Sequence, residues 1–93
     1  MKTHLHTPSN LYTYIEKTQN MANLRAQIEN KEKELELTEE AIEQFEQNGF
    51  KEVVELLTAA YNKLHKEILI LKIDANRLER QLLLFELEIS LED

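Results

Sequence analysis

The chain has 93 residues, a net charge of −7, one Gly, one Pro and no Cys. This length suits a single domain, and the scarcity of Gly and Pro excludes a fold of many short strands, which needs frequent turns. The lack of Cys excludes a disulfide framework and indicates a reducing cytoplasm, while the acidic charge disfavours nucleic acid and anionic membranes as direct partners.

Residues 1–7 are predicted to form a flexible N-terminal tail. They lead into no apolar run, and no run in the chain is long enough for a membrane span, so neither a signal peptide nor a span is expected. In an extended tail His4 and His6 point the same way and could share a metal ion with His65. The alternative is two solvated histidines in a disordered tail, and since a pair of ligands is not a site, we predict no metal and no cofactor.

A first helix is predicted over residues 8–47. Its apolar row alternates steps of three and four residues, which is the heptad pattern of a coiled coil. Thr7 suits the N-cap and Pro8 the first helical position. Asn48-Gly49, with the only Gly of the chain, suits the left-handed turn that ends a helix. The members of the row are Met21, Leu24, Ile28, Lys31, Leu35, Thr38, Ile42 and Phe45.

A second helix is predicted over residues 50–90, after a turn at 48–49. The end of the chain also alternates in steps of two, which is typical of a strand. Helix is favoured because the heptad row continues through Phe85 and Ile89 and because Glu and Leu prefer helix. A short link forces the two helices antiparallel, so the predicted fold of residues 8–93 is all-α, a long coiled-coil-like hairpin. The second row comprises Phe50, Val54, Leu57, Tyr61, Leu64, Ile68, Leu71, Ala75, Leu78, Leu82, Phe85 and Ile89.

The second helix carries more apolar surface than one partner helix can cover. We therefore expect a homodimer or higher oligomer, with two hairpins packed as a four-helix bundle and the second helices at its centre. If residues whose numbers sum to about 97 face each other, Glu46 lies beside Lys51 and Glu32 beside His65. The same rule brings Tyr12, Tyr14 and Ile15 beside residues 82–85, where we expect them to close the end of the core, the alternative being an aromatic contact patch. The predicted oligomer interface consists of Leu37, Ala41, Val53, Leu56, Ala60, Ile70, Ile73, Leu84, Leu87 and Leu91.

Six glutamates recur at steps of three and four along one side of the first helix, over about 25 Å at 1.5 Å per residue. Neighbours of like charge four residues apart repel one another. The row is either a solvated face that keeps the assembly soluble or a binding site for a basic protein. These candidate partner-binding residues are Glu29, Glu32, Glu36, Glu39, Glu43 and Glu46.

The pattern of potential catalytic residues does not indicate an enzyme. We find no Gly-rich loop, no Ser or Cys nucleophile at a recognisable distance from a base, and no His-x-x-x-His pair. The expected function is a non-enzymatic protein–protein interaction module, a homo-oligomeric acidic hairpin that acts as adaptor or inhibitor. A second alternative is an acidic mimic that blocks a nucleic-acid-binding protein.

In size and hairpin architecture the chain resembles the small WXG100 family of secreted helical hairpins, which have a Trp-x-Gly turn at mid-chain. Here the turn reads Gln47-Asn48-Gly49 without the Trp, and the Tyr-x-x-x-Asp/Glu tail signal of that family is absent. The resemblance is one of architecture. It implies a small secretion-type hairpin or a secretion chaperone as the alternative function.

Overall fold

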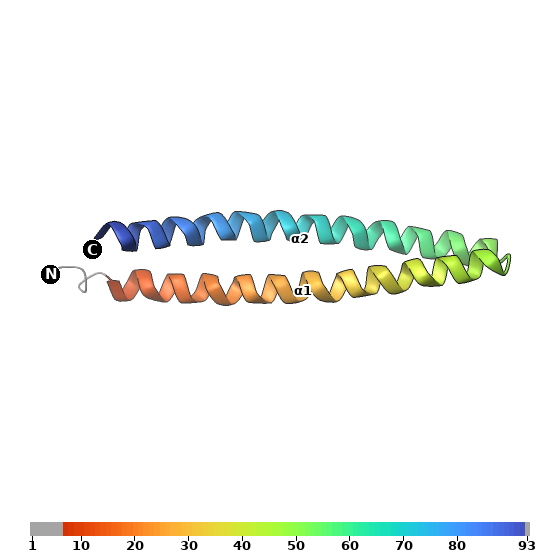
Figure 1. Ribbon diagram of the computed structural model, residues 1–93, viewed down its shortest axis with the longest axis horizontal. Coiled ribbons are helices and arrows are strands. Elements are labelled where there is room, and N and C mark those ends of the chain that lie inside the picture. Colours follow the sequence, from red (N-terminus) through yellow and green to blue (C-terminus); the bar gives the residue numbers. More distant parts are fainter. Residues whose placement is uncertain (1–6, 93) are drawn as a thin grey trace.

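The computed structural model describes residues 7–92, and side chains are described for residues 11–91. Helix α1 (Thr7–Gln47) has 41 residues and helix α2 (Lys51–Glu92) has 42. The two helices run side by side in opposite directions and meet at one turn (Figure 1), in a rod of 71 × 14 × 14 Å. The predicted all-α hairpin is confirmed. Over its described length, neither helix is apolar enough to cross a membrane.

Helix α1 ends at Gln47 as predicted, and the other three helix ends differ from the predicted ones by one or two residues. Thr7, the predicted N-cap, lies inside α1, and α2 begins at Lys51 rather than Phe50 and continues to Glu92. Differences of this size are usual at helix ends, which fray. The strand alternative for the end of the chain is wrong, because α2 includes all of it up to Glu92. The predicted flexible tail, Thr7 apart, lies outside the described residues.

The turn between the helices is a Schellman motif. The Gly49 N–H donates to the Glu46 carbonyl at 3.1 Å, and the Phe50 N–H donates to the Phe45 carbonyl at 3.0 Å. Gly49 has a φ of 78°, a left-handed conformation that only a residue without Cβ adopts at no steric cost. The rings of Phe45 and Phe50 meet edge to face with centroids 5.8 Å apart, which is the apolar contact that accompanies this motif.

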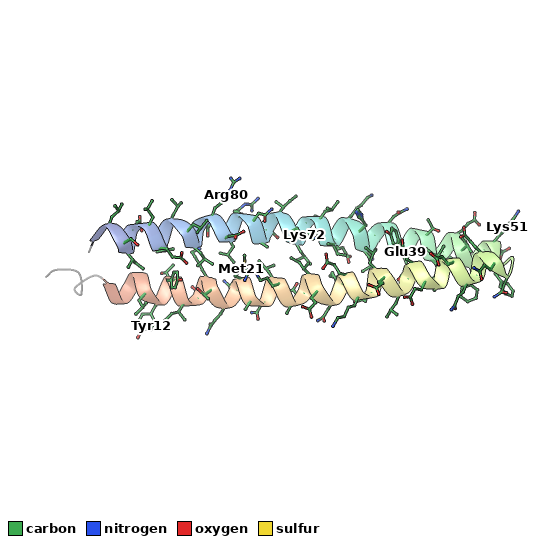
Figure 2. All side chains as sticks on the ribbon, in the orientation of Figure 1. Tyr12, Met21, Glu39, Lys51, Lys72 and Arg80 are labelled. Atoms are coloured by element: carbon green, nitrogen blue, oxygen red, sulfur yellow. The ribbon has the colours of Figure 1, made fainter. Side chains whose placement is uncertain are left out.

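The core of the hairpin is a single seam between the two heptad rows. Among the described residues only Met21, Ile68 and Ala75 are buried, at 5%, 4% and 8% exposure, and Met21 lies between the helices in Figure 2. The other row members within α1 and α2 are half-buried, apart from the exposed Ile89. Two helices share only one side, so the hairpin alone has little dry interior.

Two polar residues occur in the apolar row of α1, and each has a partner. Lys31 Nζ lies 3.1 Å from Glu67 Oε1 across the seam, and the Thr38 hydroxyl donates to the Glu34 carbonyl at 2.8 Å. No buried side-chain nitrogen or oxygen lacks a partner in the described part of the chain. The Lys31–Glu67 pair also helps to fix the register, because sliding one helix along the other separates it.

The observed register is close to the predicted one, with one difference. The Lys31–Glu67 pair joins residues whose numbers sum to 98. Glu32, however, pairs with Lys72 at 3.1 Å and not with His65 as expected. Glu46 and Lys51 line the same groove at the turn, but no ion pair joins these two described side chains.

Candidate functional site

The six predicted partner-binding glutamates divide into a paired end and a free end. Glu29 lies 3.6 Å from Lys33 on the same helix, and Glu32 lies 3.1 Å from Lys72 of α2. The remaining four are exposed and have no ion pair among the described side chains. We call these four, nearest the turn, the free acidic face: Glu36, Glu39, Glu43 and Glu46.

The free acidic face lies within the most charged part of the chain. Residues 29–46 contain eight Glu and two Lys, so they hold a charge of −6 out of the total of −7. The steps of three and four residues keep the carboxylates of the free acidic face on one side of the helix, where their fields add. Because the side chains are exposed, attraction of a cationic partner is strong at low salt and screened beyond about 8 Å at physiological salt.

The predicted oligomer interface is open to solvent in the single hairpin. Leu56 and Leu91 are the most exposed of its members, at 74% and 75%, whereas Ala41 and Val53 are half-buried. These exposed apolar side chains contrast with the small core of the hairpin, in which only three of the described residues are buried. The other members, all exposed, are Leu37, Ala60, Ile70, Ile73, Leu84 and Leu87.

Four basic residues lie on α2 between the apolar residues of the predicted interface. The sequence analysis missed them because it grouped only apolar residues there. They are spaced by steps of three and four with those residues, so a heptad search that included polar residues could have found them. Arg80, for example, points away from α1 in Figure 2. We call the whole set the outer row: Leu56, Ala59, Lys63, Lys66, Ile70, Ile73, Arg77, Arg80, Leu84, Leu87 and Leu91.

The aromatic residues near the start of α1 have different environments. Tyr14 packs edge to face on Phe85, with centroids 6.3 Å apart, as the register predicts. Its hydroxyl donates to Glu86 Oε2 at 3.0 Å, and this hydrogen bond and the carboxylate charge raise the pKa of Tyr14. Tyr12 points away from α2 (Figure 2) and is exposed, and Ile15 is exposed too. The prediction that Tyr12 and Ile15 help to close the core is therefore wrong. Tyr12 lies about 200° from Tyr14 around the helix.

The grooves between the helices are open and lined by both polar and apolar side chains. One of about 470 Å³ runs beside the middle of the seam, and amide groups of both helices line it together with Asp74 and Arg77. Within the described residues no group of three or more His, Asp or Glu side chains is placed to hold a metal ion. His65 lies beside Tyr61 with ring centroids 6.4 Å apart, and His4 and His6 lie outside the described residues. The groove is lined by Asn20, Asn23, Leu24, Gln27, Asp74, Arg77, Leu78 and Gln81.

Comparison of the chain with protein-family models, curated proteins and solved structures finds no match. Function is therefore inferred from the two surfaces that the fold presents, the free acidic face of α1 and the outer row of α2.

Proposed function

We propose that the protein is a non-enzymatic protein–protein interaction module, a homo-oligomeric acidic hairpin that acts as adaptor or inhibitor. Its free acidic face binds a basic surface of another protein, and the apolar surface of α2 joins copies of the chain. The two activities use different helices, so a partner can bind α1 while α2 is occupied.

The observation that supports this proposal most strongly is the lack of internal neutralisation at the free acidic face. Lysines compensate Glu29 and Glu32, yet the four glutamates nearest the turn have no ion pair among the described side chains. Like-charge repulsion along this row costs a few tenths of a kcal/mol per pair, and the negative end of the helix dipole adds to that cost. A cationic partner removes both penalties on binding.

The row of unpaired carboxylates also favours a second candidate function, an acidic mimic that occupies the nucleic-acid-binding site of its partner. A straight helix holds these charges in a fixed line, as a nucleic acid backbone holds its phosphates. The mimic requires that the partner cannot bind nucleic acid and this protein together. Competition between the two for the purified partner distinguishes it from a simple adaptor.

The test compares two variants with the same change in charge. Tagged wild-type protein is used to capture and identify the partner, which is then purified. The affinity of this partner is measured for the wild type, for a control variant and for a variant in which Gln replaces Glu36, Glu39 and Glu43. The Gln variant keeps the helix, because Glu and Gln have similar propensities. We expect it to bind about tenfold more weakly, with less dependence on salt, since exposed charge pairs contribute about 0.2 to 1 kcal/mol each.

The control variant changes Glu16, Glu52 and Glu79 to Gln. All three side chains are exposed and lie outside the free acidic face, so the affinity should remain near that of the wild type. Equal weakening by both variants would indicate a general charge effect. Full binding by the Glu36, Glu39 and Glu43 variant would contradict the proposed role of the acidic face.

A further inference from the structure

The outer row gives α2 a second heptad seam, on the side opposite the one that α1 covers. Its eleven members are all exposed, and their steps of three and four residues match those of the core row. Apolar and basic pairs alternate along it every seven residues. In chain order the pairs are Leu56 and Ala59, Lys63 and Lys66, Ile70 and Ile73, Arg77 and Arg80, and Leu84 and Leu87, followed by Leu91.

The basic pairs lack partners in the single hairpin. Lys63, Lys66 and Arg80 have no ion pair among the described side chains, and Arg77 lies 3.8 Å from Asp74 of its own helix. Where a heptad row forms a helix interface, polar positions within it select one register and one orientation. The order of apolar and basic pairs along the outer row can therefore be used to infer which helix packs on it and in which direction.

We propose that α2 of a second copy of this chain covers the outer row, packed antiparallel with a two-fold axis near residue 75. In this arrangement residues whose numbers sum to about 150 face each other. The inference rests on the self-association in the proposed function and specifies its geometry. The four helices then lie in the order α1, α2, α2, α1, which places Leu37 and Ala41, the α1 members of the predicted interface, outside the contact.

The alternation of the pairs favours this register over those shifted by one heptad. With the sum near 150, Lys63 faces Leu87 of the second copy and Ile70 faces Arg80, so every basic layer lies on an apolar layer. The long stems of Lys and Arg cover apolar surface while their charged ends reach the solvent. An antiparallel register one heptad shorter sets Lys63 against Arg80. A parallel pair in register sets each basic residue against itself, and both arrangements are repulsive.

Carboxylates beside the outer row favour the same register. Glu88 is exposed and has no ion pair among the described side chains, and the register brings it next to Lys63 of the second copy. Asp74, near the two-fold axis, comes next to Arg77 of the second copy. On the other side of the row Leu69 and Leu83, both about half exposed in the hairpin, face each other across the interface. Charge and apolar contacts are thus satisfied together.

Cysteine cross-linking tests the geometry directly, because the natural chain has no Cys. Asn62, Asn76 and Ser90 are exposed and lie at 14-residue intervals along one side of the outer row, so single Cys variants there should keep the fold. A short bis-maleimide cross-linker is added to each variant alone and to mixtures. We expect Asn76→Cys to cross-link with itself and Asn62→Cys to cross-link only with Ser90→Cys, because two Asn62 sites lie about 42 Å apart.

Each other result overturns the inference. Self-cross-linking of all three single variants indicates a parallel pair. Any other pattern of cross-links indicates a different interface, as does the lack of any cross-link in a protein that sediments as a dimer. In those cases self-association, and with it the proposed function, still holds. A wild-type chain that sediments as a monomer at all concentrations overturns both this geometry and the proposed self-association.

Discussion

Two isoleucines of α2, two positions apart, distinguish the inner seam from the outer row. Ile68 is 4% exposed and Ile70 is 59% exposed. Ile→Ala removes three carbon atoms, worth about 0.8 kcal/mol each when fully buried, and leaves a cavity at Ile68. Ile68→Ala should therefore cost the hairpin about 2 to 4 kcal/mol, whereas Ile70→Ala should cost it about 1 kcal/mol because much of that side chain is already in water.

The order reverses for association. If a second copy buries the rest of Ile70, Ile70→Ala removes up to about 1.4 kcal/mol per copy, or about 3 kcal/mol per dimer, which weakens the dimer about 100-fold. Urea unfolding followed by circular dichroism at low concentration measures the first effect, and sedimentation equilibrium the second. The gain in helix propensity from Ala is common to both variants and cancels. Equal losses of hairpin stability, or an unweakened dimer for Ile70→Ala, would refute this reasoning.

Three further changes test the fold. Gly49→Ala should destabilise the protein by about 1 to 2 kcal/mol in urea unfolding, because a residue with a Cβ is strained at the left-handed φ of 78°, even though no other atom lies within 4 Å of the added Cβ. An unchanged urea midpoint would argue against this conformation of the turn. Lys31→Met should stabilise the hairpin by about 1 kcal/mol, because the half-exposed ion pair contributes little and the row gains an apolar residue; a loss of stability would show that the pair matters more. Tyr14 has a raised pKa, so its contribution to the stability of the fold is present below the ordinary tyrosine pKa and lost as the pH rises through the raised one. Thermal melts should show this alkaline loss of stability in the wild type and in the control Tyr12→Phe, but not in Tyr14→Phe.

The hairpin was predictable because one period dominates the sequence. The core row of α2 continues from Phe50 to Ile89 without a polar member, and Gly49 interrupts the helical pattern at mid-chain. These two features set the helix lengths, the turn and the antiparallel direction. The core row of α2 also favours helix for the last residues. The strand-like alternation there arises because Glu and apolar residues happen to alternate along this part of the helix.

The cross-seam partners were less predictable because a number rule follows backbone positions and not side-chain direction. Every Cα–Cβ bond on a helix tilts toward the N-terminus, so a side chain covers the surface about one residue before its own position. In an antiparallel pair this displaces contacts on both helices and raises the sum from about 97 to about 99. Tyr14 with Phe85 and Lys17 with Gln81 agree with the shifted value. The Glu32–Lys72 pair departs further, with numbers that sum to 104.

The functional surfaces were only partly predictable. The spacing of the glutamates was evident, but the sequence could not show that Lys72 of α2 neutralises Glu32 while Glu36 and Glu43 remain unpaired, since that depends on the packing of the helices. The apolar residues of the outer row were identified apart from Ala59, and their excess led to the prediction of a partner. The basic residues between them appear in the same heptad row once polar positions are included, and the proposed orientation depends on them.

Sedimentation equilibrium of the wild-type chain over a wide range of concentrations tests the central claim most directly, namely that the exposed outer face of α2 is an interface between copies. We predict an average mass of at least two chains at the higher concentrations, falling toward one chain on dilution. A mass of one chain at every concentration, with helical circular dichroism intact, would contradict it.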